Sequence, residues 1–162
     1  MTDSALAREI FERTWNAPLQ TVWELWTTPD GFASWFGPRG FRAEVDSMDL
    51  RPGGKLVFRM IADSPQMVAR FEAMGRPTSW SVEAVYDDVE PMTRLSYTTA
   101  DAPMGPGQTT EFRRIVTFEE TDEGVKMVLV LEAGTPRFLG GAAMGFKSAL
   151  ERFGEQLGFS AG

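Results

Sequence analysis

The chain has 162 residues, 43% of them hydrophobic and 24% charged, and its 23 acidic residues outnumber its 16 basic ones to give a net charge of −7. This acidic balance, with no basic stripe, argues against nucleic-acid binding, which takes most of its affinity from phosphate neutralisation. Cysteine and histidine are both absent, which excludes disulfides, thiolate metal sites and any catalytic triad that uses imidazole.

The first part of the sequence predicts one strand followed by two short helices. Residues 8–15 alternate between two faces, as a strand requires. Asn16 or Ala17 is expected to cap the first helix, and Asp30 is expected to cap the second. A Gly-Pro pair at 37–38 should end the second helix.

Six further strands are predicted from residue 41 onward, because the periodicity of apolar residues changes to two. They cover residues 41–50, 55–62, 80–89, 93–100, 109–120 and 125–133. Arg51-Pro52-Gly53-Gly54 has the composition of a turn between the first two of these strands. Residues 63–78 break the rhythm and are interpreted as a loop with a short helix, and residues 102–108 as a loop.

Residues 136–158 predict a long helix with one broad apolar face. Its apolar residues recur at steps of three and four: Leu139, Ala142, Ala143, Phe146, Ala149, Leu150, Phe153 and Leu157. Such a face needs a partner, which the strands supply. We therefore predict an α+β helix-grip fold, in which a curved antiparallel sheet of six to seven strands wraps around the long C-terminal helix, with two short helices after the first strand. Because a helix is only about 10 to 12 Å wide, we expect an apolar cavity beside it.

Several motifs together resemble one protein family. They are WNAPLQTVWELWTTPDGFASWFGP at 15–38, the Arg51-Pro52-Gly53-Gly54 turn, the Phe58 strand, RLSYT at 94–98, VTFEE at 116–120 and Gly145-Phe146. The chain is similar, from about Glu9 to Leu157, to the activator of heat shock protein 90 ATPase homologue-like family of the START or Bet v 1-like (SRPBCC) superfamily. The resemblance implies a single domain over residues 1–162, with a hydrophobic cavity between sheet and long helix. Phe146 differs from the family's usual tryptophan, and residues 63–79 form a longer connection than usual.

Candidate cavity-lining residues are side chains of the strands and helices that could face inward. They are Trp35, Phe58, Met60, Trp80, Tyr97, Phe112, Arg114, Met127, Met144 and Phe146. For the apolar ones, ordinary core packing is the alternative. Arg59 and Arg114 each lie in an apolar strand, where an inward-facing cation needs a carboxylate or an anionic ligand, and a position on the solvated face is the alternative. Glu83 and Tyr97 could perform acid–base chemistry in a cyclase-like pocket.

Three functions stay open at this point. The first, which we favour, is a non-enzymatic carrier or sensor that binds a small hydrophobic molecule in the cavity. The second is a co-chaperone-like module that stimulates a chaperone ATPase, and the third is a cofactor-independent enzyme similar to polyketide cyclases. We expect no cofactor, no metal site, no nucleic-acid partner and no membrane insertion, because no apolar run is long enough to span a bilayer. The opening residues lack the apolar core of a signal peptide, so we expect a cytoplasmic location, and a homodimer stays open.

Overall fold

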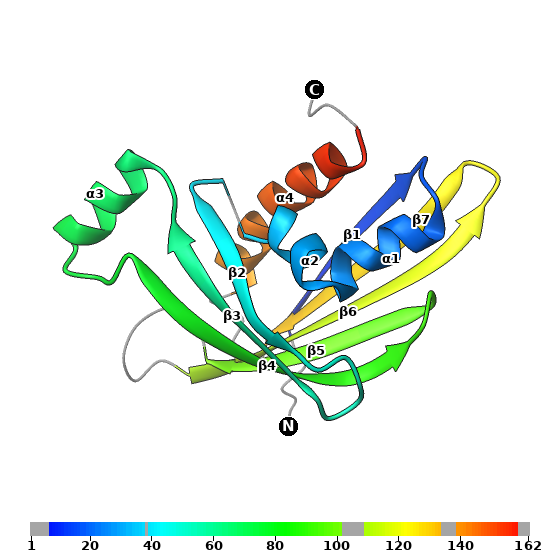
Figure 1. Cartoon of the computed structure of the whole chain (residues 1–162), viewed down its shortest axis with the longest axis horizontal. Coiled ribbons are helices and arrows are strands. Elements are labelled where there is room, and N and C mark those ends of the chain that lie inside the picture. The colour runs from blue at the N-terminus through cyan, green and yellow to red at the C-terminus, as the bar shows by residue number, and fades with distance from the viewer. Residues whose placement is uncertain (1–6, 38, 102–108, 134–138, 159–162) are drawn as a thin grey trace.

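A computed structural model describes residues 7–37, 39–101, 109–133 and 139–158. It contains an antiparallel seven-stranded sheet with the strand order β1-β7-β6-β5-β4-β3-β2 (Figure 1). The strands are β1 (Ala7–Trp15), β2 (Phe41–Met48), β3 (Lys55–Ala62), β4 (Ser79–Glu90), β5 (Arg94–Asp101), β6 (Thr109–Thr121) and β7 (Gly124–Ala133). The helices are α1 (Leu19–Thr27), α2 (Pro29–Trp35), α3 (Pro65–Ala73) and α4 (Leu139–Gln156). The predicted fold class is confirmed.

The order of the strands follows from the short connections along the chain. From β2 to β7, each strand pairs with the next one in sequence, and β1 pairs with β7. The turn between β2 and β3 needs glycine at two positions. Gly53 has a φ of +83°, and a Cβ on Gly54 would lie 2.0 Å from the carbonyl oxygen of Asp49.

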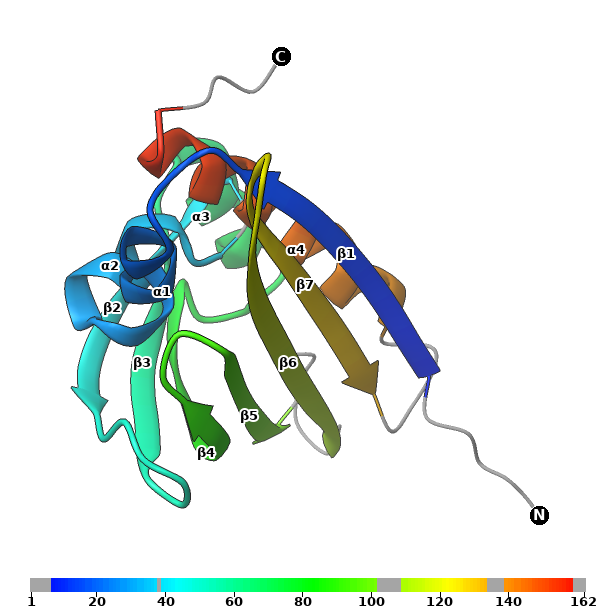
Figure 2. The ribbon, with the colours of Figure 1, turned by 90° about the vertical axis from the view of Figure 1, so that its right-hand side faces the viewer.

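Helices α1, α2 and α4 lie on the concave side of the sheet, which we call the inner face (Figures 1 and 2). Helix α4 contacts β1, β7 and α2, and α1 contacts β6. The ring of Phe153 in α4 lies 5.3 Å from that of Trp15, 6.1 Å from Trp26 and 5.0 Å from Trp35. This aromatic cluster joins the helices to the sheet, since each large side chain contributes about 1.5–3 kcal/mol when it is buried.

Two predicted helix starts were wrong by a few residues. Helix α1 begins at Leu19, and Pro18 rather than Asn16 or Ala17 occupies its cap position. Helix α2 is capped by Thr28, whose hydroxyl accepts a hydrogen bond from the amide of Gly31 at 3.0 Å. Proline is well suited to the first helical position because its φ is already helical. Pro29 therefore starts α2 two residues earlier than a cap at Asp30 would.

Helix α3 forms in the region that was interpreted as a loop with a short helix. It projects to one side of the molecule (Figure 1) and none of its residues is fully buried. The ring of Phe71 stacks on Trp80 with centroids 5.8 Å apart and meets Phe41 edge-on at 5.5 Å. The predicted loop at 102–108 and the predicted start of the last helix at 136 fall outside the described residues.

Candidate functional site

A row of polar side chains, which we call the inner row, crosses the inner face of the sheet. Tyr86 in β4 is paired with Tyr97 in β5, and Tyr97 is paired with Arg114 in β6. Directly paired residues on antiparallel strands point to the same face, so the three side chains are neighbours. Tyr86 and Tyr97 are each 1% exposed, and their ring centroids lie 6.2 Å apart.

Arg114 is surrounded mainly by aromatic rings. The centre of its guanidinium lies 5.5 Å from the rings of Tyr97 and Phe112 and 5.8 Å from that of Phe146 in α4. Its Nη1 donates hydrogen bonds to Thr99 Oγ1 at 2.7 Å and to the carbonyl oxygen of Phe112 at 3.1 Å. Among the described residues it has no carboxylate partner, and its shielded Nε meets no acceptor. Burial lowers the pKa of Arg114, and the neighbouring Tyr97 opposes this shift; an arginine nevertheless stays charged.

The hydroxyls of Tyr86 and Tyr97 are also buried and, within the described part of the chain, lack a hydrogen-bond partner. Burial raises the pKa of Tyr97 to about 12, although the charge of Arg114 opposes this. Burial is also the main reason that the pKa of Tyr86 is raised. Both phenols therefore keep their protons at neutral pH and remain donors. Because a buried donor without a partner costs about 1–3 kcal/mol, an acceptor that reaches this row would stabilise it.

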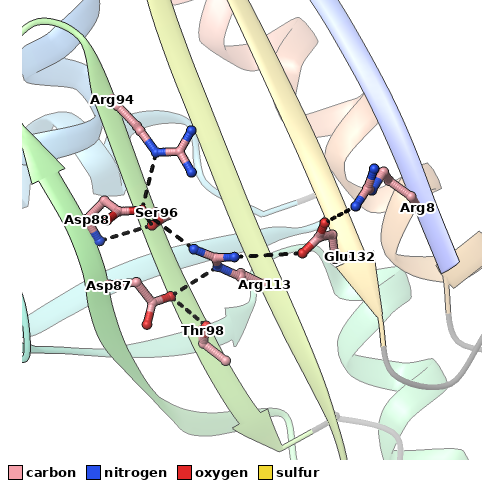
Figure 3. A network of polar contacts seen from close by, with 8 residues as sticks. All are labelled: Arg8, Asp87, Asp88, Arg94, Ser96, Thr98, Arg113 and Glu132. Carbon is pink, nitrogen blue, oxygen red and sulfur yellow. Dashed lines mark hydrogen bonds and ion pairs between the residues drawn. The ribbon is translucent and has the colours of Figure 1, made fainter. Parts of the chain in front are cut away.

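The convex outer face of the sheet carries a polar network of a different kind (Figure 3). Arg113 lies 3.5 Å from a carboxylate oxygen of both Asp87 and Asp88 and 4.0 Å from one of Glu132. Arg8 in β1 donates a 2.7 Å hydrogen bond to Glu132. The β-bulge between Tyr86 and Asp88 lets both aspartates contribute to this face. On this side, the protein itself neutralises its arginines.

Comparison with known proteins shows where this architecture belongs. Residues 16–158 match the family model described as Activator of Hsp90 ATPase homolog 1-like protein. The chain belongs to this family. The family predicted from the sequence motifs is thereby confirmed. No curated protein matches the chain.

Solved structures share the fold of this AHSA1-like chain at low sequence identity. A protein from Chromobacterium violaceum is 20% identical, with a TM-score of 0.73 over 93% of this chain and 96% of that chain. A protein from Arthrobacter aurescens is 16% identical, with a TM-score of 0.78 over 98% of this chain and 90% of that one. An AHSA1-like protein from Aeromonas hydrophila is 20% identical, with a TM-score of 0.65 and coverages of 91% and 90%. These likenesses support the fold.

Most of the predicted cavity-lining residues of the AHSA1-like chain lie in its interior. Trp35, Phe58, Met60, Tyr97, Phe112, Met127 and Phe146 are each at most 7% exposed. Only three of these surround Arg114, namely Tyr97, Phe112 and Phe146. Met127 instead accepts a hydrogen bond from Trp26 Nε1 at 3.4 Å, within the packed core.

Trp80 and Met144 lie away from this group. Trp80 is partly buried and packs with Phe41 and Phe71, beside α3. Met144 is 75% exposed, so the prediction that it faces inward was wrong. It precedes Phe146 by two residues, which turns it by about 200° around the helix, and Phe146 faces the sheet.

Two polar candidates lie on the outer face. Arg59 contacts carboxylates of Glu44 at 2.8 Å and Asp46 at 3.3 Å, so the solvated position is the one it takes. Glu83 is exposed and pairs with Lys55 at 2.8 Å. Glu83 and Tyr97 therefore do not share a site.

Two polar residues of the inner face, Thr99 and Tyr86, were missed by sequence reasoning. Thr99 follows Tyr97 by two positions, so strand alternation alone could have placed both on one face. Tyr86 could be found only from the β4–β5 register, which shifts at the bulge next to it. Among the described residues, no group of three or more acidic side chains is placed to hold a metal ion, and no helix there is long and apolar enough to span a membrane.

Proposed function

We propose that this AHSA1-like protein binds a small, mainly apolar molecule between the inner face of the sheet and α4, as a carrier or sensor in the cytoplasm. The observation that supports this most is the set of three buried donors, Tyr86 Oη, Tyr97 Oη and Arg114 Nε, that meet no acceptor in the described part of the chain. Buried polar groups in folded proteins nearly always have a partner. A ligand with one acceptor group and an apolar body would supply it.

The chemistry of the row favours binding over catalysis. General base catalysis needs a group that takes up a proton near neutral pH. Two protonated phenols and a guanidinium cannot do so, and the chain contains no histidine or cysteine. The carboxylate considered for a cyclase-like reaction, Glu83, is exposed on the outer face. The site is thus suited to desolvating and hydrogen-bonding a ligand.

A neutral fluorescent probe, N-phenylnaphthylamine, tests the binding function directly. We expect its emission to rise with a one-to-one stoichiometry and the protein to melt at a higher temperature when it is bound. Val116 and Ile115 are consecutive in β6 and point to opposite faces, so they offer a matched pair of variants. Val116→Phe, which adds bulk to the inner face, should weaken binding several-fold, while Ile115→Phe should leave it unchanged. Equal binding by both variants, or no binding by the wild type, would count against an inner-face site.

The family's name supports a second candidate, stimulation of the ATPase of an Hsp90-type chaperone. Such an activity would use a protein surface, so it should survive Val116→Phe. A steady-state ATPase assay of the purified chaperone, with and without saturating amounts of this protein, tests it. An unchanged rate would remove this candidate.

A further inference from the structure

We infer that the molecule bound at the inner row carries an anionic group, such as a carboxylate or sulfonate, and that Arg114 binds this group. The inference rests on the proposed function, because it specifies the chemistry of the same ligand. Three features of the site lead to it: the guanidinium Nε that meets no acceptor, the lack of a carboxylate beside it among the described residues, and its apolar surroundings.

The hydrogen bonds of Arg114 to the described residues leave its Nε without an acceptor. Nη1 is held by Thr99 Oγ1 at 2.7 Å and by the Phe112 carbonyl at 3.1 Å, which fixes the orientation of the planar group. On the edge formed by Nε and Nη2, the buried Nε meets no acceptor among the residues that the structure describes. Two parallel N–H groups on such an edge match the two oxygens of a carboxylate. The Tyr97 hydroxyl, from the paired position on β5, supplies a further donor beside it.

The charge of Arg114 is not balanced by an acidic side chain in the described part of the chain. Its three ring contacts at 5.5–5.8 Å attract the cation but accept no strong hydrogen bonds. A charge that is partly shielded from water, as that of Arg114 is, is costly without an opposite partner. Acidic residues are plentiful, with 23 in the sequence, and the adjacent Arg113 has three of them within 4.0 Å. Among the described residues, the lack of an anion at Arg114 is therefore a property of this position rather than of the composition.

The surroundings also limit what kind of anion fits. Next to Arg114 on the inner face lie Val116 and Leu131, which are 1% and 2% exposed, and Phe146 covers it from α4. One guanidinium balances one negative charge, and apolar walls disfavour further polar groups. The site therefore suits a monoanionic amphiphile or aromatic acid, rather than a sugar phosphate or nucleotide.

The inference is tested with two probes that differ in one group. Anilinonaphthalene sulfonate carries the ring system of N-phenylnaphthylamine plus a sulfonate, so the ratio of their dissociation constants isolates the contribution of the charge. We expect the wild type to bind the sulfonate about 10- to 100-fold more tightly, as one buried charge-assisted pair provides. Dodecanoate should likewise displace the bound probe at a lower concentration than dodecanol.

Variants assign the charge preference to one residue. Arg114→Met should bring the ratio of the two dissociation constants close to one, whatever its effect on the neutral probe. Arg114→Lys should retain part of the preference, because lysine keeps the charge but loses the two parallel N–H groups of the guanidinium. Arg113→Met is the matched control and should leave the ratio unchanged; circular dichroism and thermal melting establish that each variant is folded. If both probes bind equally and Arg114→Met changes nothing, the anionic ligand is wrong and the binding function stands. If neither probe binds the wild type, the binding function itself is wrong.

Discussion

Arg113 and Arg114 are adjacent in β6 and lie in opposite environments. Arg113 faces outward and is surrounded by the carboxylates of Asp87, Asp88 and Glu132. Arg114 faces inward, where aromatic rings surround it and no described carboxylate reaches it. Among the described residues, Arg113 thus has its partners within the protein, whereas the inner row leaves donors without acceptors.

The contrast separates what stabilises this fold from what equips it for a ligand. On the outer face, polar groups are satisfied by the protein, although exposed ion pairs contribute little to stability. On the inner face, stability comes from apolar and aromatic packing, and the polar row opposes it. Polar groups without partners in an otherwise apolar interior lower stability, and such positions are typical of functional sites. Substitutions in the two regions should therefore change the free energy of unfolding by different amounts and in different directions.

The largest effect is expected from the aromatic packing beneath α4. Phe153 is 0% exposed, and its ring lies near three tryptophan rings. Phe153→Ala should lower the free energy of unfolding by about 3–5 kcal/mol, because it leaves a cavity in a close-packed core. Ile10, which is 62% exposed on the outer face, provides the control. Ile10→Ala should change the free energy of unfolding by less than about 0.5 kcal/mol. Urea denaturation measures both, and similar losses would contradict the contrast between the faces.

A change of opposite sign is expected from the inner row. Arg114→Met replaces a partly buried cation, which has no carboxylate partner among the described residues, by an apolar chain of similar length. In the ligand-free protein we expect a gain of about 1–2 kcal/mol in unfolding free energy, which corresponds to a rise of about 2–4 °C in melting temperature per kcal/mol. Differential scanning calorimetry checks the direction. A clear loss of stability would mean that the ring contacts and the Thr99 bond already compensate for burying Arg114.

A smaller loss is expected from the neighbouring residue on the outer face. Arg113 is 39% exposed, so its attraction to the three carboxylates is screened by water. Arg113→Met should lower the unfolding free energy by about 0.5–1 kcal/mol, and the loss should shrink in high salt. Denaturation curves at low and high salt measure this. A loss that does not respond to salt would indicate packing by the side-chain stem instead of charge.

The sequence predicted the fold of this chain better than its site. Strand alternation and the apolar stripe of residues 136–158 depend on local periodicity, which a single sequence contains. The site depends on which side chains meet across strands, and a bulge of one residue changes that. Arg59 and Arg114 look alike in sequence, since each lies among apolar strand residues, yet they point to opposite faces.

The register of the strands explains why these two arginines differ. In β3, Leu56, Phe58 and Met60 are buried, so Arg59 faces out. In β6, Phe112 and Val116 are buried, and Arg114 shares their face. The alternation within each strand was enough to show which face its arginine takes. The partners of Arg114 could not be found in this way, because Thr99 and Phe146 lie far from it in sequence.

The smallest effect is a dependence on pH that only the outer network should show. Asp88 accepts hydrogen bonds from the Ser96 hydroxyl at 3.0 Å and from Arg94 Nε at 3.2 Å. These two bonds, in that order, lower the pKa of Asp88 below its usual 3.8. A carboxyl group whose pKa is lower in the folded state adds stability above its unfolded pKa, and this contribution is lost as the pH falls through the folded value.

Asp88→Asn should therefore reduce the stability at neutral pH and flatten the loss of stability in acid, below about pH 4. Because Asp88 is 37% exposed, we expect less than about 1 kcal/mol. Urea denaturation of the wild type and the variant across this pH range gives the two slopes. Arg114→Met should keep the wild-type slope, since the phenols and guanidinium of the inner row do not titrate in acid. Parallel slopes for Asp88→Asn and the wild type would show that Asp88 does not contribute to acid sensitivity, and a changed slope for Arg114→Met would reveal a carboxylate coupled to the inner row.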